Sequence, residues 1–439
     1  MPQLRKTCLA LAVGCLVLLA IGLAAGMPYL WQPAAVAAAV GLALGLGAFP
    51  ALRGYQFTAW IIVAVTAGML YPQRFLRWGD FDLRNKWLIL LVVQAVMFGM
   101  GTQMKLRDFA GIAKMPWGVV VAVFCQFTIM PLVGFALTRL FSFPDEIAAG
   151  IILIGCCSSG LASNVMAYLA GANLALSITA TAITTMLAPL MTPLWMKLLA
   201  GALVEVSFLN MMAEIVKIVL VPIGAALLHD YLNHASPRGR RRVLVLAAAG
   251  AVWLLFLLSG GWAWLAARFP GLPLTAIGLA GFLVAAVPAG VLYHALARML
   301  PGLDRAMPLA SMAGIIYFTT VTTAAGRDNL LTVGALLFLA SVIHNGAGYV
   351  LGYGLSRACR LDVNSARAIA FEVGLQNGGM ASGLAGAMGK LGTVGLAAAI
   401  FSPWMNVSGS ILANFWRRRP AAAPARLHPT GAPASLLRK

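Results

Sequence analysis

Charged residues are scarce in this sequence, and their scarcity excludes a soluble globular protein. Of the 439 residues, 10% are Asp, Glu, Lys or Arg and 61% are hydrophobic. Soluble domains average about 25% charged and about 45–50% apolar residues. Apolar runs of roughly 18 residues or more recur along the whole length, as membrane-spanning helices require and outer-membrane strands do not. The composition therefore predicts an all-α polytopic membrane protein.

Clustered metal ligands and catalytic groups are lacking as well. The six cysteines lie in or beside apolar segments without any CxxC or Cys/His spacing, which argues against a metal centre or a disulfide framework. The five histidines are scattered, and only His344 is expected deep in an apolar run. A membrane enzyme would need an acid, a base or a metal cluster at that depth, and a channel would need a continuous polar lining. We therefore expect neither an enzyme nor a channel.

Basic residues are abundant, with a formal net charge of +19, but their positions point to the membrane rather than to nucleic acid. They cluster in alternate gaps between the apolar runs, which is the positive-inside pattern. The clusters are Arg5 and Lys6; Lys105, Arg107 and Lys114; Arg238, Arg240, Arg241 and Arg242; Arg357, Arg360 and Arg367; and Arg417, Arg418 and Arg419. This alternation predicts both termini on the cytoplasmic side of a bacterial-type inner (plasma) membrane, although the basic gap at 72–86 goes against it. It also favours a retained first helix at 8–26 over the alternative that this segment is a signal peptide.

The apolar runs divide the chain into about fourteen spanning segments. We place them near 8–26, 33–50, 57–71, 87–104, 117–140, 146–170, 173–199, 206–232, 243–265, 272–297, 307–325, 331–356, 364–388 and 393–416. The remaining tail, 417–439, is basic and rich in Pro and Ala. Such a composition is typical of a disordered end, which we expect in the cytoplasm.

Two of these segments share an unusual interruption. Segment six contains GCCSSGLASNVMAYLAGAN (155–173) and segment thirteen contains FEVGLQNGGMASGLAGAMG (371–389), so each is sixth of seven within its half. Because seven is odd, the second half would enter the membrane with the opposite polarity. Two broken helices at corresponding places of an inverted repeat indicate the binding site of a secondary transporter. We expect the breaks near 158–165 and 372–380.

Glu372 is the acid that we expect deepest in the membrane. The other acids lie in gaps or at segment ends, except Glu214, which has Lys217 one turn away on the same helical face. One interpretation of Glu372 is a protonated carboxyl group that is hydrogen-bonded in a helix interface. The other is a cation ligand or a proton carrier.

The polar residues around the two breaks favour a cation such as Na⁺, a hard ion that takes several oxygen ligands. Ser163 and Asn164 follow the first break, and Ser177 and Thr181 are four residues apart, hence on one face of the next helix. Taken alone, the latter two residues are more often ordinary interhelical hydrogen bonders. Gln126 is another isolated polar residue in an apolar run, and by itself it is as well explained by helix packing.

Five stretches, taken together, resemble the bile acid:sodium symporter family. They are ASNVMAYLAGANLALSITATAITTMLAPLMTP (162–193), IHNGAGYVLGY (343–353), EVGLQNGGMASGLA (372–385), MFGMGTQMKLRDF (97–109) and CQFTIMPL (125–132). The resemblance covers roughly 57–232 and 305–416, with several motifs in the family's order and spacing. It implies a ten-helix inverted repeat, in which a core domain with two crossing broken helices moves against a panel domain.

The resemblance also implies two sodium sites and a substrate cavity. The first sodium site would use Ser163, Asn164, Ser177, Thr181 and Glu372. The second would use the side chains of Gln126 and Gln376 with the backbone of Glu372, Val373 and Leu375. The substrate cavity would lie beside the crossing, near Leu161, Asn377, Met405 and Asn406.

The chain departs from the family pattern in three places. Ser158, Ser159, Gly160 and Leu161 replace a Pro-Gly-Gly-Thr-like run, and Met405-Asn406 replaces a His-Asn pair in the last helix. Both changes fall on the expected substrate side, so sodium coupling is better indicated than the substrate. Extra helix pairs at 1–56 and 233–304 are the third departure, and they suggest a thicker panel or a homodimer contact.

These features together favour sodium-coupled symport, specifically uptake of an organic anion such as a bile-acid-like carboxylate or sulfonate. The alternative is a sodium- or proton-linked antiporter or exporter, for example a relative of arsenite exporters. Cys156 and Cys157 near the first break support that alternative, since a metalloid carrier would use a thiolate. Adjacent cysteines on a helix point about 100° apart, however, and more often serve in packing.

Overall fold

The structure is almost entirely helical. The computed structural model describes residues 2–49, 52, 55–269 and 274–419. In these residues the one sheet is a small antiparallel hairpin of β1 (Arg77–Trp78) and β2 (Phe81–Asp82). All fourteen predicted segments coincide with helical stretches, which confirms the prediction of an all-α polytopic membrane protein. The predicted disordered tail lies, beyond Arg419, outside the described residues.

Ten helices in the described part of the chain are long and apolar enough to cross a membrane. The other four predicted segments are not single long helices. One of them is the 15-residue helix Gln56–Leu70, and another is Lys86–Gly101, which is bent by 65° from the helix that follows it. The segments at 146–170 and 364–388 each consist of two short helices around a break, where the sequence predicted the breaks. The number fourteen and the inverted repeat stay predictions.

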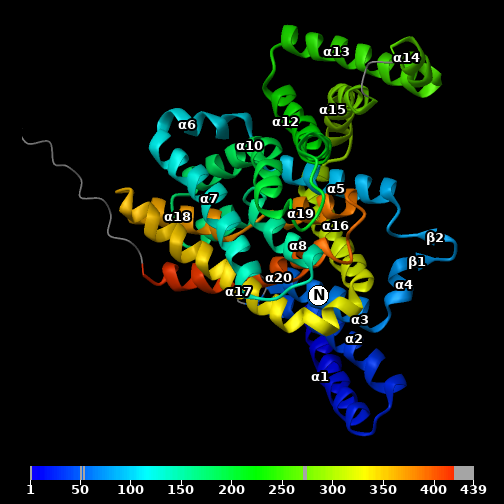
Figure 1. Ribbon diagram of the computed structural model, residues 1–439, viewed down its shortest axis with the longest axis vertical. Helices are drawn as coiled ribbons and strands as arrows, with labels where there is room; N and C mark the ends of the chain where they lie inside the picture. Colours follow the sequence, from blue (N-terminus) through cyan, green and yellow to red (C-terminus); the bar gives the residue numbers. More distant parts are fainter. Residues whose placement is uncertain (1, 50–51, 53–54, 270–273, 420–439) are drawn as a thin grey trace, which may run out of the picture.

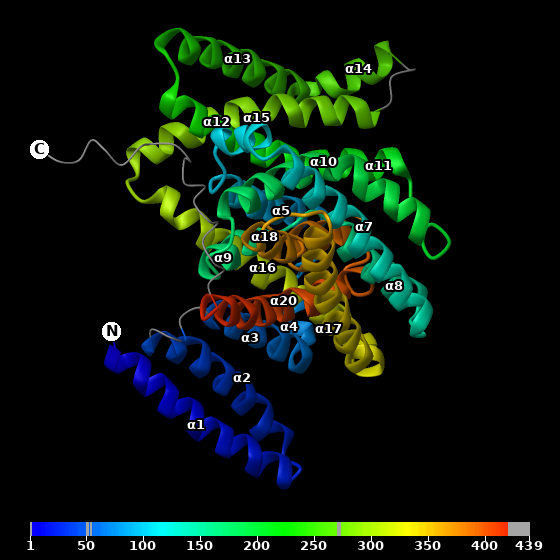
Figure 2. The ribbon, with the colours of Figure 1, turned by 90° about the vertical axis from the view of Figure 1, so that its left-hand side faces the viewer.

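One set of helices forms a row that we call the panel. Its members are α1 (Pro2–Ala24), α2 (Pro28–Gly45), α3 (Gln56–Leu70), α5 (Lys86–Gly101), α12 (Val221–His234), α13 (Pro237–Phe256), α15 (Leu274–Met299) and α16 (Leu303–Ala325). Each helix packs against the next in the order α1, α2, α3, α16, α5, α12, α15, α13. In Figures 1 and 2, α1 and α2 lie at one end of the long axis, and α13 and α15 lie at the other.

The order of the row shows what the two extra helix pairs do to the panel. The pair α1–α2 continues the row beyond α3, and the pair α13–α15 continues it beyond α12. The panel is therefore longer at both ends, whereas the sequence suggested a thicker panel. The homodimer contact stays a prediction.

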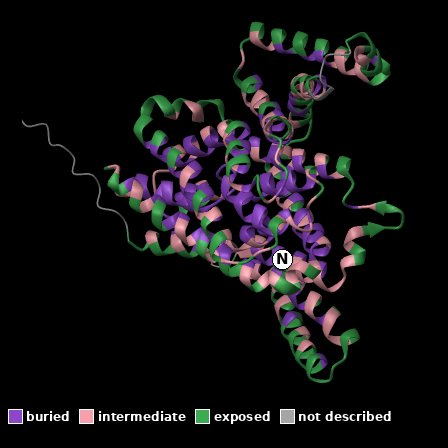
Figure 3. Cartoon of the chain, in the orientation of Figure 1, coloured by how far each residue is buried: buried purple, intermediate pink, exposed green. Residues whose placement is uncertain are grey.

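The second set of helices, which we call the core, packs on one another beside the middle of the panel. Its members are α7 (Pro116–Leu140), α8 (Asp145–Cys156), α9 (Ala162–Leu169), α10 (Leu174–Ala200), α17 (Arg327–Ala358), α18 (Val363–Gly374), α19 (Gly378–Ala387) and α20 (Val394–Arg417). The panel reaches the core mainly through α5 on α19 and through α3 and α16 on α20. Figure 3 shows that the buried residues gather in this central region.

Shorter elements connect these helices. They are η1 (Leu46–Ala48), α4 (Pro72–Leu76), η3 (Leu106–Ala110), α6 (Gly111–Lys114), α11 (Phe208–Ile215), the π-helical η4 (Val216–Leu220) and η5 (Leu257–Gly261), and α14 (Trp262–Arg268). In the exposed β1–β2 hairpin, Arg84 forms an ion pair of 2.8 Å with Asp82. The Arg84 hydrogen bonds hold the pKa of Asp82 at about 2, so this carboxylate stays ionised at neutral pH.

The outer helices of the panel expose their apolar side chains. Within its most apolar window, α1 buries 11% of its residues and the α13–α14 stretch buries 17%, whereas α7 in the core buries 56%. Such all-round apolar helices need another apolar phase around them. In a membrane that phase is lipid, so both ends of the panel contact the bilayer.

Candidate functional site

The two predicted breaks meet each other at the centre of the core. Ser159 and Gln376 form an isolated antiparallel bridge, the Gly160 amide donates to the Leu375 carbonyl (2.9 Å) and the Asn377 amide donates to the Ser158 carbonyl (2.9 Å). A Cβ on Gly160 would lie 2.8 Å from the Gln376 carbonyl oxygen, so glycine is needed for the close approach. The bonds satisfy backbone groups that the breaks remove from their helices, as burial in lipid requires.

Glu372 lies one turn before the second break and is 1% exposed. Ser177 donates a hydrogen bond to its Oε1 (2.5 Å) and Thr181 donates to its Oε2 (2.8 Å). Both hydroxyls also approach Asn164 Oδ1, at 2.9 Å and 3.2 Å. Because Ser177 and Thr181 share one face of α10, a single helix presents both hydroxyls to the same carboxylate.

Ser163 completes this group of oxygen atoms. Its hydroxyl donates to the Gly160 carbonyl (2.8 Å) and lies 3.3 Å from Thr181 Oγ1. Ser159, which sequence analysis had not assigned to a sodium site, lies 3.3 Å from both the Ser163 hydroxyl and the Leu375 carbonyl. The break removes the helical periodicity that would have connected Ser159 with Ser163, so only the fold brings them together.

The oxygen atoms of this group suit a hard monovalent cation. We call Ser159, Ser163, Asn164, Ser177, Thr181 and Glu372 the oxygen cluster. It contains one carboxylate and neutral oxygens, with no ion pair to Glu372 among the described residues. Hard cations take several such ligands. Transition metals favour imidazole and thiolate ligands, and the oxygen cluster contains neither, so its donor set fits Na⁺ better than a transition metal.

Gln126 and Gln376 form a second polar group on the other side of the crossing. Gln126 Nε2 donates to Gln376 Oε1 (2.8 Å) and to the Cys157 carbonyl (2.9 Å), and Gln376 Nε2 donates to the Val373 carbonyl (2.6 Å). These bonds fix the orientation of the Gln126 amide. Its Oε1 is buried and has no hydrogen-bond partner. An unpaired buried oxygen is costly, and a cation bound there would relieve that cost.

The backbone carbonyls expected to join this second site are only partly available. The Val373 carbonyl accepts from Gln376, and the Leu375 carbonyl accepts from the Gly160 amide and the Ser159 hydroxyl. A carbonyl oxygen has two lone pairs. Val373 therefore keeps one for a cation, whereas Leu375 already uses both.

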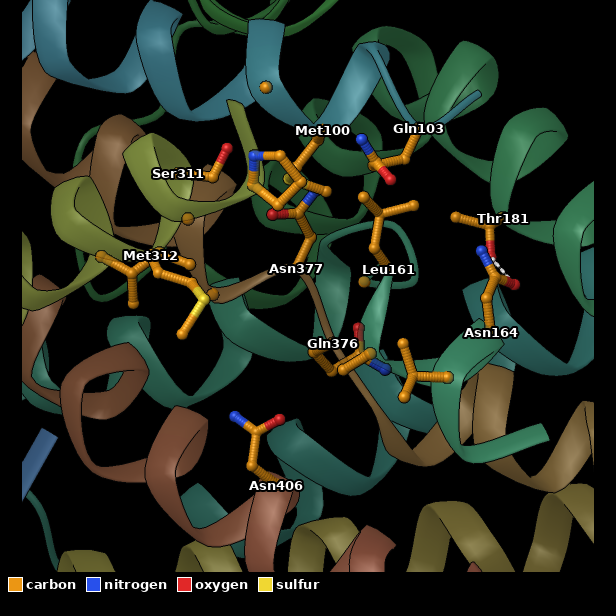
Figure 4. A pocket seen from close by; sticks show the side chains of 18 of the residues that line it. Met100, Gln103, Leu161, Asn164, Thr181, Ser311, Met312, Gln376, Asn377 and Asn406 are labelled. Atoms are coloured by element: carbon orange, nitrogen blue, oxygen red, sulfur yellow. Dashed lines mark hydrogen bonds between the residues drawn. The ribbon is translucent and has the colours of Figure 1, made fainter. Parts of the chain in front are cut away.

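A cavity of about 570 Å³ lies between the crossing and the panel. All four residues expected near the substrate, Leu161, Asn377, Met405 and Asn406, line it. The panel contributes residues that sequence analysis had not singled out, namely Met100 of α5, Gln103 in the turn that follows α5, and Ser311 and Met312 of α16. Figure 4 shows these side chains facing those of the crossing. No local pattern distinguishes them, because only packing of the panel on the core makes them neighbours.

The cavity also touches both sodium-site candidates. Asn164 and Thr181 of the oxygen cluster line it, and so does Gln376. Ser158 and Ser159 do not line it, and both are fully buried within the crossing. The run at 158–161, which differs from the family pattern and was expected on the substrate side, therefore lines the cavity only with its last two residues, Gly160 and Leu161.

The polar lining of the cavity carries hydrogen-bond donors and no charge. Among the described residues that line it, none is Asp, Glu, Lys, Arg or His. The N-termini of α9 and α19 begin at its wall, where their partial positive charge favours an anion. Asn377 caps α19 through its Oδ1, which accepts from the Met380 amide (3.0 Å). Its Nδ2 is buried without a partner, in a side chain that is 2% exposed.

The panel and the core are in close contact at the other end of α5. A Cβ on Gly383 of α19 would lie 2.4 Å from Val93 Cγ2, and one on Gly386 would lie 2.7 Å from Ile89 Cγ2. Val93 and Met97 are fully buried there. The cavity thus lies at one end of the panel–core interface, and a tight seal of α5 on α19 closes the other.

The two adjacent cysteines and the deep histidine lie outside the cavity. Cys156 and Cys157 are fully buried behind the crossing, where their carbonyls accept hydrogen bonds from Thr192 and Gln126. His344 is bonded to the Met130 carbonyl (2.9 Å). None of these three residues lines the cavity, so packing explains them, and the thiols are not placed to carry a metalloid.

Two broken helices that cross beside a cavity form the architecture of a secondary transporter, and comparison with known proteins gives the family. The sequence profile of the Sodium Bile acid symporter family matches residues 88–267. An uncharacterized sodium-dependent transporter, YocS, of Bacillus subtilis (strain 168) is 34% identical over 367 residues, a match that covers 83% of this chain and 92% of the relative. The chain therefore belongs to the sodium/bile acid symporter family, and it is a sodium-dependent membrane transporter.

Two further relatives extend the comparison to eukaryotes. A probable chloroplastic sodium/metabolite cotransporter of Arabidopsis thaliana is 28% identical over 372 residues, which cover 84% of this chain and 75% of that protein. The human ileal sodium/bile acid cotransporter is 27% identical over 295 residues, which cover 66% of each chain. Their names agree on sodium and differ in the transported compound.

Proposed function

We propose that this protein is a sodium-coupled uptake symporter for an organic anion with a substantial apolar body. The observation that carries the proposal is the unpartnered Nδ2 donor of Asn377, buried at the wall of an uncharged cavity. A carboxylate or sulfonate would accept from it and lie near the N-termini of α9 and α19. Apolar side chains such as Leu161, Met100 and Met312 would contact the remainder of the molecule. Methionine adapts to irregular shapes, so the cavity would tolerate varied apolar bodies.

Sodium would act through the geometry of the crossing. In the oxygen cluster one Na⁺ would replace the present hydroxyl–carboxylate hydrogen bonds with direct oxygen ligands from α9, α10 and α18. A second Na⁺ would use Gln126 Oε1 together with Gln376. Both ions would hold the two breaks in one arrangement, and the breaks position Asn377 and the helix N-termini at the cavity. Anion affinity should therefore rise with sodium, and by linkage sodium affinity should rise with the anion.

The position of the cavity supports the assignment of this conformation to the cytoplasmic step of transport. It lies at the end of α5 that leads to Lys105 and Arg107, which the charge pattern assigns to the cytoplasm. This conformation would then be the one that releases the anion and sodium inside the cell. The seal of α5 on α19 would open in the conformation that accepts them from outside.

The test is replacement of the only buried carboxylate in the oxygen cluster. We expect Glu372→Gln to abolish sodium-driven uptake in proteoliposomes assayed with a panel of small and steroidal carboxylates and sulfonates. Loss of a charged ligand costs on the order of 1.5–3 kcal/mol, so sodium affinity should fall by at least about tenfold. The matched control is Glu205→Gln, which makes the same chemical change outside the cluster. Normal sodium-driven uptake by a folded Glu372→Gln protein would show that the cluster does not bind the coupling ion.

A further inference from the structure

The first turns of α13 carry an arginine face that the protein does not neutralise. Arg238, Arg241 and Arg242 are exposed, and in the part of the chain that the structure describes their guanidinium groups form no ion pair or hydrogen bond. The same face continues with Val245 and Leu246, because positions i, i+3, i+4, i+7 and i+8 lie on one side of a helix. These two side chains are 62% and 60% exposed.

The opposite side of α13 is the one that packs on the protein. Val243, Ala247 and Gly250 are buried, and a Cβ on Gly250 would lie 3.2 Å from Val284 Cγ1 on α15. The arginine face therefore points away from the panel. Because α13 is the last helix of the row, no other described helix covers that face.

The arginines and the aliphatic side chains of this face are separated along the helix as the phosphate and the acyl chains are in a phospholipid. The guanidinium groups precede the aliphatic pair by up to eight residues, or about 12 Å at 1.5 Å per residue. Arginine binds phosphate oxygens in a bidentate manner. Exposed Val252 and Leu255 extend the apolar surface toward the far end of α13.

Nearby acids do not compete for these arginines. Asp304 accepts a hydrogen bond from the Tyr293 hydroxyl and lies 3.6 Å from His229 Nε2. Asp230 accepts from the Leu106 amide (3.1 Å). Arg240, between the other arginines, donates to the Leu232 carbonyl, and its buried Nε has no partner. This end of α13 therefore has unused donors and a surplus of positive charge.

We propose that the arginine face of α13 binds the phosphate of an anionic phospholipid, with an acyl chain along Val245 and Leu246. The proposal does not depend on the transported compound or on sodium coupling. An annular lipid held there fixes the α13–α15 end of the panel in its leaflet. It gives this extra helix pair a function, as an anchor for the panel while the core moves.

The experiment measures binding of fluorescent phosphatidylglycerol to the purified full-length protein in neutral detergent. The variant R238Q/R241Q/R242Q removes the arginine face. An arginine near an anionic lipid contributes about fivefold in affinity, so losing three should weaken binding on the order of 100-fold. The matched control is K105Q/R107Q/K114Q, which removes the same charge from a basic cluster predicted on the same side of the membrane. The control should retain binding within about twofold.

Two further measurements distinguish a lipid from other anions and guard against misfolding. Soluble glycerol 3-phosphate should compete at least about 100-fold more weakly than the lipid, and Val245→Ser should weaken lipid binding without affecting glycerol 3-phosphate. The single variant R241Q, compared with R241K, replaces the triple variant if that protein does not fold. Equal loss of binding in both triple variants, or equal competition by glycerol 3-phosphate, would overturn the proposal. Unchanged phosphatidylglycerol binding by the folded arginine variant would overturn it too.

Discussion

Replacing Gly383 with alanine should disfavour the conformation in which α5 seals against α19. The new Cβ would lie 2.4 Å from Val93 Cγ2, a distance that real Cβ contacts essentially never show. Val93 is fully buried, so its side chain has little room to turn away. One of the two helices must therefore move, and the panel–core interface is where they can separate.

The size of the effect follows from the cost of overpacking. An extra methyl group in a well-packed contact typically costs about 1–3 kcal/mol. If only the sealed conformation has this contact, its population relative to the opened one falls by a factor of roughly 5 to 150. Alanine has a higher helix propensity than glycine by about 1 kcal/mol, and that gain is equal in both conformations. The net change is a shift toward the conformation with the cavity end closed.

The assay uses the cavity as a reporter. In a background without the native cysteines, Gln103→Cys marks the cavity wall, and a membrane-impermeant thiol reagent measures its access from the predicted cytoplasmic side. Labelling should slow by up to about 150-fold in Gly383→Ala, because the sealed fraction falls by at most the same factor as the ratio of the two conformations, and adding Val93→Ala should restore it. Gly354→Ala is the control, because nothing lies within 4 Å of a Cβ at that position. Unchanged labelling in a folded Gly383→Ala protein, or no rescue by Val93→Ala, would refute the assignment of the seal.

Three other predictions concern the proposed sodium and substrate sites. Ser177→Ala and Gln126→Ala should each weaken sodium binding by about 1–3 kcal/mol and should act on different ions. Sodium titrations of the double variant should therefore show additive losses. Identical effects of the two changes on the Hill coefficient would indicate one shared site. Asn377→Asp keeps the oxygen that caps α19 but replaces the unpartnered donor with an acceptor. The affinity for the anion should therefore fall at least about tenfold. An unchanged affinity would show that Asn377 does not belong to the substrate site. Removing sodium should lower anion affinity by the same factor by which removing the anion lowers sodium affinity. Equilibrium binding measured at several sodium and anion concentrations checks this equality. An anion affinity that does not depend on sodium would contradict symport.

Much of the fold could be predicted because it depends on local pattern. Apolar runs of spanning length become helices wherever lipid or protein surrounds them, since a backbone in the membrane must bond to itself. The two breaks were equally local. Gly160 allows a close backbone approach, and Asn377 caps the helix that follows. Glu372 and the hydroxyls around it could be singled out because polar groups at that depth are costly unless they have a role.

The tertiary structure alone decided which of these residues meet. Ser159 joins the oxygen cluster and Gln126 is left with an unpaired oxygen because two breaks more than 200 residues apart pair as a bridge. Gln103 and Ser311 line the cavity only because the panel packs across the core. The order of the panel helices, with an extra pair at each end, likewise follows no local signal. Hydrophobic periodicity shows that a helix buries a face, whereas shape complementarity between distant faces selects its neighbour.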